Sequence, residues 1–296
     1  MKNFVIIVCF TVFVSIPVFS QTENDIDLSF YASTKGEMQL NFTPQWKFPF
    51  LQGSHPLTRE NNIVFKLDTS LNPIWMGLTG DSILTIAPFI SFRLGAMVGT
   101  GWNYNLFGKD HLVGLGMNRK TNINDPANSV AIGNGFDGIV WDVHSGSLLQ
   151  FDLAAFFPGN WNHVVMQFYN QIDYFAYSKA KGDEFWYYLD DEGMNQNTFR
   201  YSFEFFIGYM MPTFVDLIGY QFSGIIPFYN LDTGTNVRER GYSFINAFIT
   251  YLKIKERHSI MTITRIKNDF TDPEKYGYER KWGFDCIQLI YTWKIK

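Results

Sequence analysis

The sequence predicts an all-β chain that folds as an antiparallel transmembrane β-barrel of about ten strands. Three observations lead to this prediction. Hydrophobic residues make up 46% and aromatic residues 18% of the 296 residues, whereas charged residues make up only 18%, below the roughly 25% usual in soluble domains. The N-terminus has the pattern of an export signal. Several segments alternate between apolar and polar residues over lengths that suit a strand crossing a bilayer.

The N-terminal segment predicts a cleaved secretory signal peptide. Lys2 lies in a short basic region, residues 4–19 are apolar and uncharged, and cleavage is expected before Gln21. A membrane anchor is the alternative. The apolar run is interrupted by Ser15 and Pro17, and it falls short of the roughly 20 residues that a spanning helix needs. We therefore expect export rather than anchoring.

Removal of residues 1–20 changes the charge and the cysteine content of the chain. Loss of Lys2 reduces the basic residues from 24 to 23 against 28 acidic residues, which gives a net charge of −5. This mild acidity argues against a nucleic-acid partner, because nucleic acids are bound mainly through basic patches. Loss of Cys9 leaves only Cys286, which excludes an intramolecular disulfide. Residues 21–296 are expected to form a single barrel domain.

The alternating pattern is clearest between Lys35 and Phe48. Apolar residues occupy the even positions from Met38 onward and polar residues the odd ones, so each kind shares one face of an extended strand. In a transmembrane barrel, the apolar face meets lipid and the polar face meets the lumen. The same pattern recurs in 149–157, 164–174, 198–208 and 287–295.

Two other structures compete with this interpretation. Residues 205–229 carry a single charge and are long enough for a transmembrane helix. However, Pro212 and Asp216 lie near the middle, where a carboxylate on a helix costs about 2.5 to 3.5 kcal/mol. A hairpin explains them better, and Arg93 interrupts the apolar stretch 83–99 in the same way. A soluble β-sandwich or barrel would have to bury the apolar face of every alternating segment.

The segments predict ten strands, with twelve as the alternative. The expected ranges are 35–48, 62–76, 83–98, 139–157, 163–175, 198–210, 214–228, 242–254, 258–268 and 281–295. Short turns are expected at 79–81, 158–162, 211–213 and 255–257, and long loops at 49–61, 99–138, 176–197, 229–241 and 269–280. Short turns at the end that holds both termini and long loops at the other are typical of outer-membrane barrels. A further hairpin, if present, is expected within 99–147.

The signal peptide, the alternating segments and the aromatic C-terminal strand together resemble bacterial outer-membrane β-barrel proteins. Segments 36–53 and 158–163 look like those of an uncharacterised, porin-like family of such barrels. The resemblance implies the bacterial outer membrane as location, its lipid bilayer as surroundings, and periplasmic chaperones and the barrel-insertion machinery as partners. Many such barrels end on an aromatic residue, whereas this chain ends on Lys296. Insertion is therefore expected to rely on Tyr291 and Trp293.

The function is expected to come from the lumen and the loops. Eight strands leave room only for side chains and sixteen to eighteen form an aqueous channel, so ten or twelve lie nearer the closed limit. We expect a narrow pore for small polar solutes, and the alternative is a structural or adhesive barrel that acts through its external loops. The polar faces predict a lumen lined by both charge signs: Lys35, Glu37, Lys66, Asp68, Arg93, Asp152, Asp173, Arg200 and Glu204.

An outer-membrane protease of the omptin type is a third hypothesis. Such enzymes use Asp-Asp and Asp-His pairs to activate a water molecule. The chain offers Asp190 with Asp191, and Asp142 with His144, but their order and spacing match poorly. We therefore assign no catalytic residue. The scattered histidines and the lack of a cysteine pair also predict no metal and no cofactor.

Three loop segments have specific expectations. Gly99-Thr100-Gly101-Trp102 and Gly114-Leu115-Gly116 are expected to bend a loop or to let it fold into the mouth of the barrel. The aromatic run 185–188 is expected to extend the neighbouring strand above the bilayer, and a contact patch on an external loop is the alternative.

Overall fold

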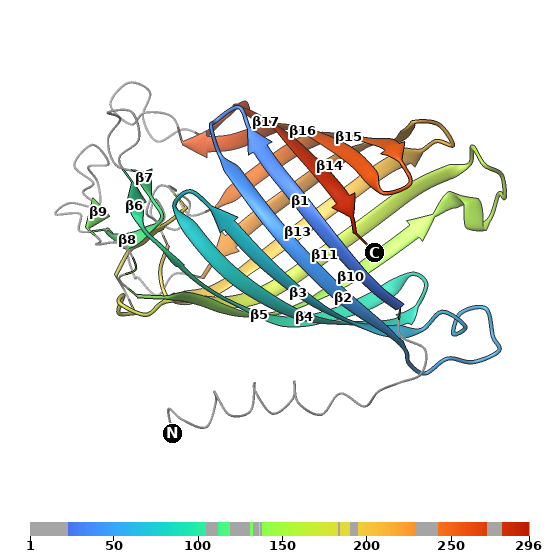
Figure 1. Cartoon of the computed structure of the whole chain (residues 1–296), viewed down its shortest axis with the longest axis horizontal. Helices are drawn as coiled ribbons and strands as arrows, with labels where there is room; N and C mark the ends of the chain where they lie inside the picture. Colours follow the sequence, from blue (N-terminus) through green and yellow to red (C-terminus); the bar gives the residue numbers. More distant parts are fainter. Residues whose placement is uncertain are drawn as a thin grey trace.

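The computed structural model describes residues 23–104, 112–118, 131–132, 136, 138–182, 184–189, 195–228, 242–270 and 280–295. Within these residues, twelve long strands close into one antiparallel barrel (Figure 1). They are β1 (Glu23–Ser33), β2 (Met38–Pro49), β3 (Asn62–Asn72), β4 (Trp75–Ala87), β5 (Ile90–Gly101), β10 (Val140–Asp152), β11 (His163–Tyr177), β13 (Thr198–Met210), β14 (Val215–Pro227), β15 (Ser243–Lys255), β16 (His258–Phe270) and β17 (Arg280–Lys294).

The barrel closes between its first and last strands. The ladder of β1 and β17 runs from Asp27 opposite Lys294 to Ser33 opposite Gln288. An even strand number makes this closure possible, because the first and last strands then run in opposite directions like every other pair. Each of the twelve strands therefore pairs on both sides, and none of them is left as an edge.

The connections lie at two ends of the barrel. The end where β1 begins and β17 finishes, here called the terminal end, carries 50–61, 88–89, 153–162, 211–214 and 256–257. The opposite end, here called the loop end and drawn at the left of Figure 1, carries the short connections 34–37 and 73–74 and the longer ones 102–139, 178–197, 228–242 and 271–279.

Among the described residues, helical structure is limited to a short element between two strands. The 3-10 helix η2 (Leu153–Ala155) follows β10, and the carboxylate of Asp152 accepts a hydrogen bond from the Ala154 amide. No helix in the described part of the chain is long and apolar enough to cross a membrane.

The strand number of twelve corrects the main prediction of ten and matches its alternative. The two additional strands do not come from 99–147. One is β1, a segment in which no strand is predicted. The other arises because 62–98, predicted as two strands around a turn at 79–81, forms β3, β4 and β5 with connections at 73–74 and 88–89. Residues 79–81 therefore lie in the middle of β4.

The error at 79–81 has a physical cause. Thr79-Gly80-Asp81 has the composition of a turn, but the three residues pair with β3 on one side and β5 on the other. Pairing on both sides thus overrides a weak local preference. Because β1 precedes it, the predicted loop 49–61 lies at the terminal end. The second added strand, within 62–101, keeps the later long loops at the loop end.

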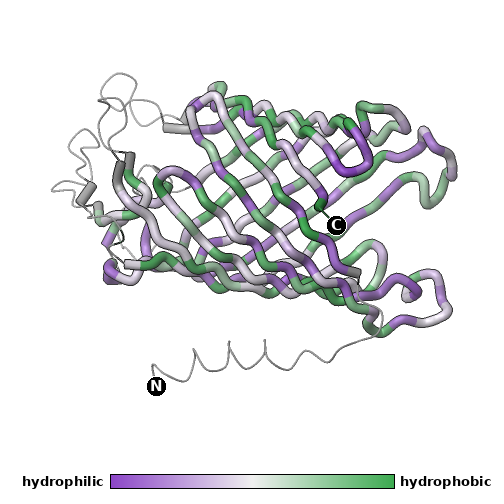
Figure 2. Tube along the Cα trace, in the orientation of Figure 1, coloured by the Kyte–Doolittle hydropathy of each residue, from purple (hydrophilic) through white to green (hydrophobic). Residues whose placement is uncertain are grey.

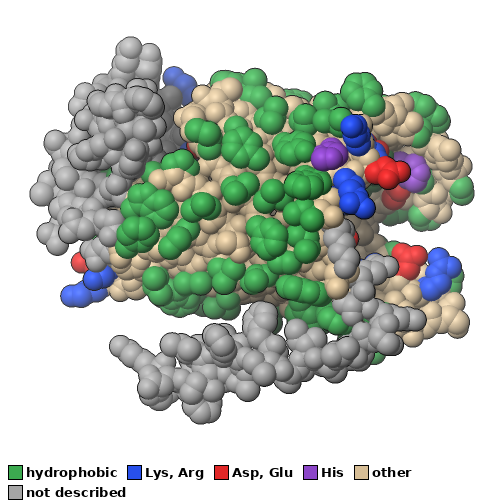
Figure 3. Space-filling model, viewed as in Figure 1, with side chains coloured by type: hydrophobic (Ala, Val, Ile, Leu, Met, Phe, Trp, Pro, Cys, Tyr) green, Lys and Arg blue, Asp and Glu red, His purple; other side chains and the backbone are tan. Residues whose placement is uncertain are grey.

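The outer face of the barrel is mainly apolar. Exposed large apolar side chains recur at alternate strand positions, for example Phe92, Leu94 and Val98 on β5, and the tube in Figure 2 changes colour along the strands accordingly. Figure 3 shows apolar side chains across the middle of one face and charged side chains toward its ends. An apolar surface of this extent is unusual for a soluble monomer and typical of a wall that faces lipid.

Described parts of two loop-end connections form small sheets. In one, β8 (Leu115–Asn118) lies between β9 (Ala131–Ile132) and β12 (Trp186–Tyr188). In the other, β6 (Asn103–Tyr104) pairs with β7 (Leu112–Val113). Segments from two separate connections therefore meet at this end of the barrel.

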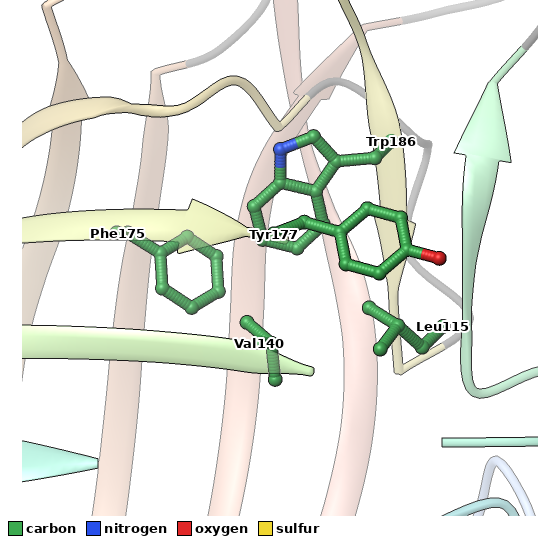
Figure 4. Packing of buried hydrophobic residues seen from close by; sticks show 5 residues of the cluster. All are labelled: Leu115, Val140, Phe175, Tyr177 and Trp186. Atoms are coloured by element: carbon green, nitrogen blue, oxygen red, sulfur yellow. The ribbon is translucent and has the colours of Figure 1, made fainter. Parts of the chain in front are cut away.

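These loop segments pack into the mouth of the barrel. The side chains of Leu115, Val140, Phe175, Tyr177 and Trp186 form one buried cluster, here called the mouth cluster (Figure 4). Trp186 is fully buried, and its ring centroid lies 4.8 Å from that of Phe175. Of the two alternatives expected for 114–116, folding into the mouth is thus confirmed. The same expectation for 99–102 is wrong, since residues 99–101 belong to β5. The expectation for 185–188 is wrong, since Trp186–Tyr188 pairs with β8 and does not extend a barrel strand.

Candidate functional site: a charged inner wall

The inner face of the wall follows from the exposed apolar side chains. On β5, Arg93 lies between the exposed residues Phe92 and Leu94, and on β13, Arg200 follows the exposed Phe199. Successive side chains of a strand point to opposite faces. Both arginines therefore point into the barrel.

One row of cross-strand neighbours brings charged side chains together on this face. Asp81 is opposite Gly95, Gly95 is opposite His144, His144 is opposite Asp173, and Asp173 is opposite Arg200. Directly opposite residues share one face of a sheet. The row therefore spans β4, β5, β10, β11 and β13 on the inside of the barrel.

His144 lies between two carboxylates. Its Nδ1 is 2.6 Å from Asp142 Oδ1, and its Nε2 is 2.8 Å from Asp81 Oδ1. Only 4% of the histidine side chain is exposed. An ionised carboxylate can only accept, so two ionised partners require a ring that carries a proton on both nitrogens. A positively charged imidazole is thus the state that satisfies both contacts.

The contact between Asp81 and His144 depends on the glycine between them. A Cβ atom at Gly95 would lie 2.3 Å from Asp81 Oδ1 and 2.4 Å from His144 Nε2. Cβ atoms do not approach other heavy atoms this closely. Any other residue at position 95 would force the carboxylate and the imidazole apart.

Arg93 holds the other side of Asp81 in a two-pronged contact. Its Nε donates to Oδ1 at 2.7 Å and its Nη2 to Oδ2 at 2.6 Å, the geometry in which a guanidinium binds a carboxylate most strongly. Its Nη1 lies 3.4 Å from the hydroxyl of Tyr169, which donates to Gln171 Oε1 at 2.5 Å. Hydrogen bonds therefore continue from β5 to β11.

The same network ends at the mouth cluster. Gln171 Nε2 lies 3.4 Å from Asp173 Oδ1. Arg200 contacts Asp173 Oδ2 at 2.8 Å through both Nε and Nη2. The guanidinium carbon of Arg200 lies 3.6 Å from the ring centroid of Phe175, within the range of a cation–π interaction. Since Phe175 belongs to the mouth cluster, the charged wall and the folded loops are in direct contact.

A second charged group lies on the opposite part of the wall. Lys35, in the connection 34–37, donates to Asp285 Oδ1, and Arg265 Nε lies 3.2 Å from Asp285 Oδ2. Arg265 is opposite Cys286, and its neighbour Ile266 is opposite Phe284, so a bulge makes room for Asp285. Burial alone would lower the pKa of Lys35, but the hydrogen bond and the attraction of Asp285 outweigh it and raise the pKa overall.

The structure places four of the nine residues predicted for the lumen within these two groups: Arg93, Asp173 and Arg200 in the first, and Lys35 in the second. Lys66 lies opposite Asp81 across the ladder of β3 and β4.

The four remaining predicted residues lie elsewhere. Asp68 accepts hydrogen bonds from two hydroxyl groups of the wall, and Glu204 is opposite Tyr169 on β13. Glu37 is exposed in the connection before β2 and accepts from the Tyr31 and Ser33 hydroxyls at 2.5 Å and 2.9 Å. Asp152 lies at the terminal end, where its Oδ2 is 2.7 Å from His163 Nδ1.

The lumen prediction omitted Asp81, Asp142, His144, Arg265 and Asp285. Asp81 was missed because the turn predicted at 79–81 removed it from a strand. Asp142 and His144 were considered only as a protease pair, although their spacing of two places them on one face of a strand. That spacing is the signal that would have found them. The bulge that brings in Asp285 leaves no pattern in the sequence.

The geometry of Asp142 and His144 does not favour the protease hypothesis. The two side chains do meet, as such a site requires. However, both ring nitrogens of His144 face carboxylates and the side chain is almost fully buried. This leaves no ring nitrogen available to accept a proton from water. The other pair, Asp190 and Asp191, lies outside the described residues.

Comparison with known proteins gives matches of low similarity. No protein-family model and no curated protein matches the chain. Solved structures that align with the chain include the NanC porin, with a TM-score of 0.42 and 7% identity, and the KdgM porin, with a TM-score of 0.41 and 6% identity. Each alignment covers 92% of this chain and 99% of the other. OmpT of Vibrio cholerae has a TM-score of 0.35 and 7% identity, over 93% of this chain and 99% of the other.

Because these TM-scores are low, the class of the chain must be inferred from its own geometry. The twelve described strands form a closed antiparallel barrel. Its outer face is apolar, and its inner face carries hydrogen-bonded charges. This inversion of the usual soluble arrangement is what lipid on the outside requires. The chain is therefore a β-barrel of the bacterial outer-membrane type.

Proposed function

We propose that this protein is a narrow passive channel for small polar solutes in the bacterial outer membrane, to which it is exported by the signal peptide 1–20. The observation that carries the proposal is the contrast between an apolar outer face and a charged inner face. A barrel that served only to anchor loops would be filled more favourably by apolar side chains, because burying paired charges brings little or no net stability. Charges on the inner wall indicate a lumen that serves polar solutes.

The position of one aromatic side chain that points inward supports a lumen that is not filled by side chains. Phe206 points inward from β13 and is buried. A Cβ atom at Gly208 would lie 2.5 Å from its ring, and one at Gly219 would lie 2.4 Å from it. The ring therefore lies flat on the wall over two neighbouring strands and does not project across the interior. Twelve strands also enclose more space than the eight that side chains fill, and less than a wide porin.

The mouth cluster sets the size limit of the proposed channel. Its members come from the wall and from two loop-end connections, and Trp186 and Phe175 are almost fully buried there. Packed aromatic rings at one end narrow the path that a solute can take. We therefore expect small solutes to pass and larger ones to be excluded at the loop end.

Swelling of vesicles tests this proposal. Protein refolded into phospholipid vesicles would be diluted into isotonic solutions of neutral sugars, from a pentose to a trisaccharide. The proposal predicts rapid swelling with the pentose and none with the trisaccharide. Folding is checked by faster migration on gels before boiling than after. If correctly folded protein gives the same rate as protein-free vesicles for every sugar, the channel is rejected and a structural or adhesive role of the loop end is favoured.

A further inference from the structure

In the first charged group, the two partners of each arginine–aspartate pair are unequally exposed, whereas His144 and Asp142 are both largely buried, at 4% and 12% exposed. The side chain of Asp81 is 1% exposed, whereas that of its partner Arg93 is 31% exposed. The side chain of Asp173 is 3% exposed, whereas that of Arg200 is 22% exposed. The carboxylates are thus hidden against the wall, and the guanidinium groups lie on the inner surface.

The second charged group has the same arrangement. Asp285 is 5% exposed, whereas Lys35 is 49% and Arg265 is 25% exposed. The reason is side-chain length: an aspartate carboxylate stays close to its strand, whereas long basic side chains lie along the wall and keep their charged ends in water. An ion in the lumen would therefore reach the arginine or lysine of these pairs before the aspartate.

The exposed cations come from different parts of the wall. In the closed order of twelve strands, β5 and β16 are six positions apart, so Arg93 and Arg265 start from opposite walls. The strand of Arg200, β13, lies midway between them. The three guanidinium groups thus come from three different parts of the wall around the lumen. A cleft with low-dielectric walls strengthens the field of such charges.

Other inward carboxylates oppose this field only in part. Asp68 is half-buried, and its two oxygens accept hydrogen bonds from Thr43 at 2.6 Å and Ser70 at 2.8 Å. Asp27 is opposite Lys294 in the ladder that closes the barrel. Glu204 is half-buried on β13. These three carboxylates do not change the position of the arginine side chains, which stay on the inner surface.

We propose that the lumen favours small anions, that is, inorganic anions and small organic acids that carry a carboxylate, phosphate or sulfate group. Arg93, Arg200 and Arg265 act as the selectivity residues, because rings of basic side chains select anions in pores. Their planar guanidinium groups also match the oxygen atoms of such solutes. This inference rests on the channel proposed above and adds the charge of its substrates.

The reversal potential across a planar bilayer with a gradient of potassium chloride tests the inference. For the native chain, we expect a chloride-to-potassium permeability ratio above one. Arg265→Gln should lower the ratio, and Asp285 then remains paired with Lys35, so the fold is retained. Arg59→Gln is the matched control. It removes the same charge from an exposed position in the connection 50–61 and should leave the ratio unchanged.

A second variant keeps the test decisive if Arg265→Gln does not fold. The double variant Asp173→Asn with Arg200→Gln removes a pair without leaving an unpaired buried carboxylate, and it should also lower the ratio. A ratio of one or below for the native chain overturns the anion preference while leaving the channel in place, and so does an unchanged ratio in the folded inner-wall variants. Folded native protein that carries no current at all overturns the channel itself.

Discussion

Asp81 is the carboxylate on which the first charged group depends. It accepts from both sides at once, from Arg93 and from His144, and its side chain is 1% exposed. A buried carboxylate is tolerated only when charged donors surround it. The neighbouring residue without a side chain, Gly95, is what lets the second donor reach it.

Replacement of Gly95 by alanine tests this arrangement. The added methyl group would lie within 2.6 Å of three polar atoms, namely Asp81 Oδ1, His144 Nε2 and the Gly80 carbonyl oxygen. We expect Gly95→Ala to lower the free energy of unfolding by about 1–3 kcal/mol, as overpacking does elsewhere. Denaturant unfolding in detergent, followed by tryptophan fluorescence, measures the change.

Gly80→Ala is the matched control for this variant. Gly80 lies on the neighbouring strand, and a Cβ atom there would meet only Leu67 Cδ1, at 4.0 Å. Its effect should stay within about 0.5 kcal/mol. Equal stability of Gly95→Ala and Gly80→Ala would show that the close contact of Asp81 with His144 is not needed.

Individual site residues were predictable where alternation alone decides the face. Arg93, Asp173 and Arg200 were predicted for the inner wall because each lies between large apolar neighbours in the sequence. Their partners depend on which strands become neighbours, and a single sequence does not contain this information. Asp81 and Asp285 were missed for this reason, since a mistaken turn and a bulge remove them from any simple alternation.

At the scale of elements, strand type was easier to predict than strand number. Alternating apolar residues mark strands β2, β11, β13 and β17 directly. The hairpins within 62–101 have connections of only two residues, and a glycine-containing stretch inside β4 looks more like a turn than the real ones. Strand β1 was missed because residues 23–27 carry three acidic side chains, which are atypical of a strand.

The mouth sheet gives a prediction at this scale. Trp186 is fully buried between β8 and the barrel wall, so Trp186→Ala should weaken the local packing by about 3–5 kcal/mol. The connection 178–197 would then open more often, and trypsin should cleave after Lys181 faster than in the native chain. The barrel itself should still migrate faster on gels before boiling.

Trp161→Ala serves as the control, because Trp161 is 55% exposed in the connection 153–162 at the terminal end. It should leave the cleavage rate unchanged. Identical trypsin cleavage of the native chain and of Trp186→Ala would contradict the packing of this sheet into the mouth.

For the whole molecule, the strongest feature of the sequence is its high aromatic content together with its low content of charged residues, and the fold explains it. Exposed aromatic and aliphatic side chains cover the outer face, so the apolar content is a surface and not an overfilled core. This could be predicted because lipid on one face and water on the other impose a period of two. The partners of the loop segments in the mouth could not be predicted, since their packing depends on contacts between distant segments.

A charged residue introduced into the outer face should affect stability differently in a membrane barrel and in a soluble barrel. Leu94 is 61% exposed on β5. In a bilayer, Leu94→Arg should reduce the folding free energy by about 2–4 kcal/mol if the residue lies near the midplane. In a water-soluble barrel, an exposed substitution changes stability by only about 0.5 kcal/mol. Urea-dependent folding into vesicles measures the difference, and Leu57→Arg in the connection 50–61 is the control.

The central claim is that this barrel spans a bilayer and conducts through its charged interior. The most direct test is the current across a planar lipid bilayer after addition of refolded protein whose folded state has been verified on unboiled gels. The account predicts discrete, uniform current steps as single barrels insert. A silent bilayer, with the same protein shown to be folded and inserted, would contradict it.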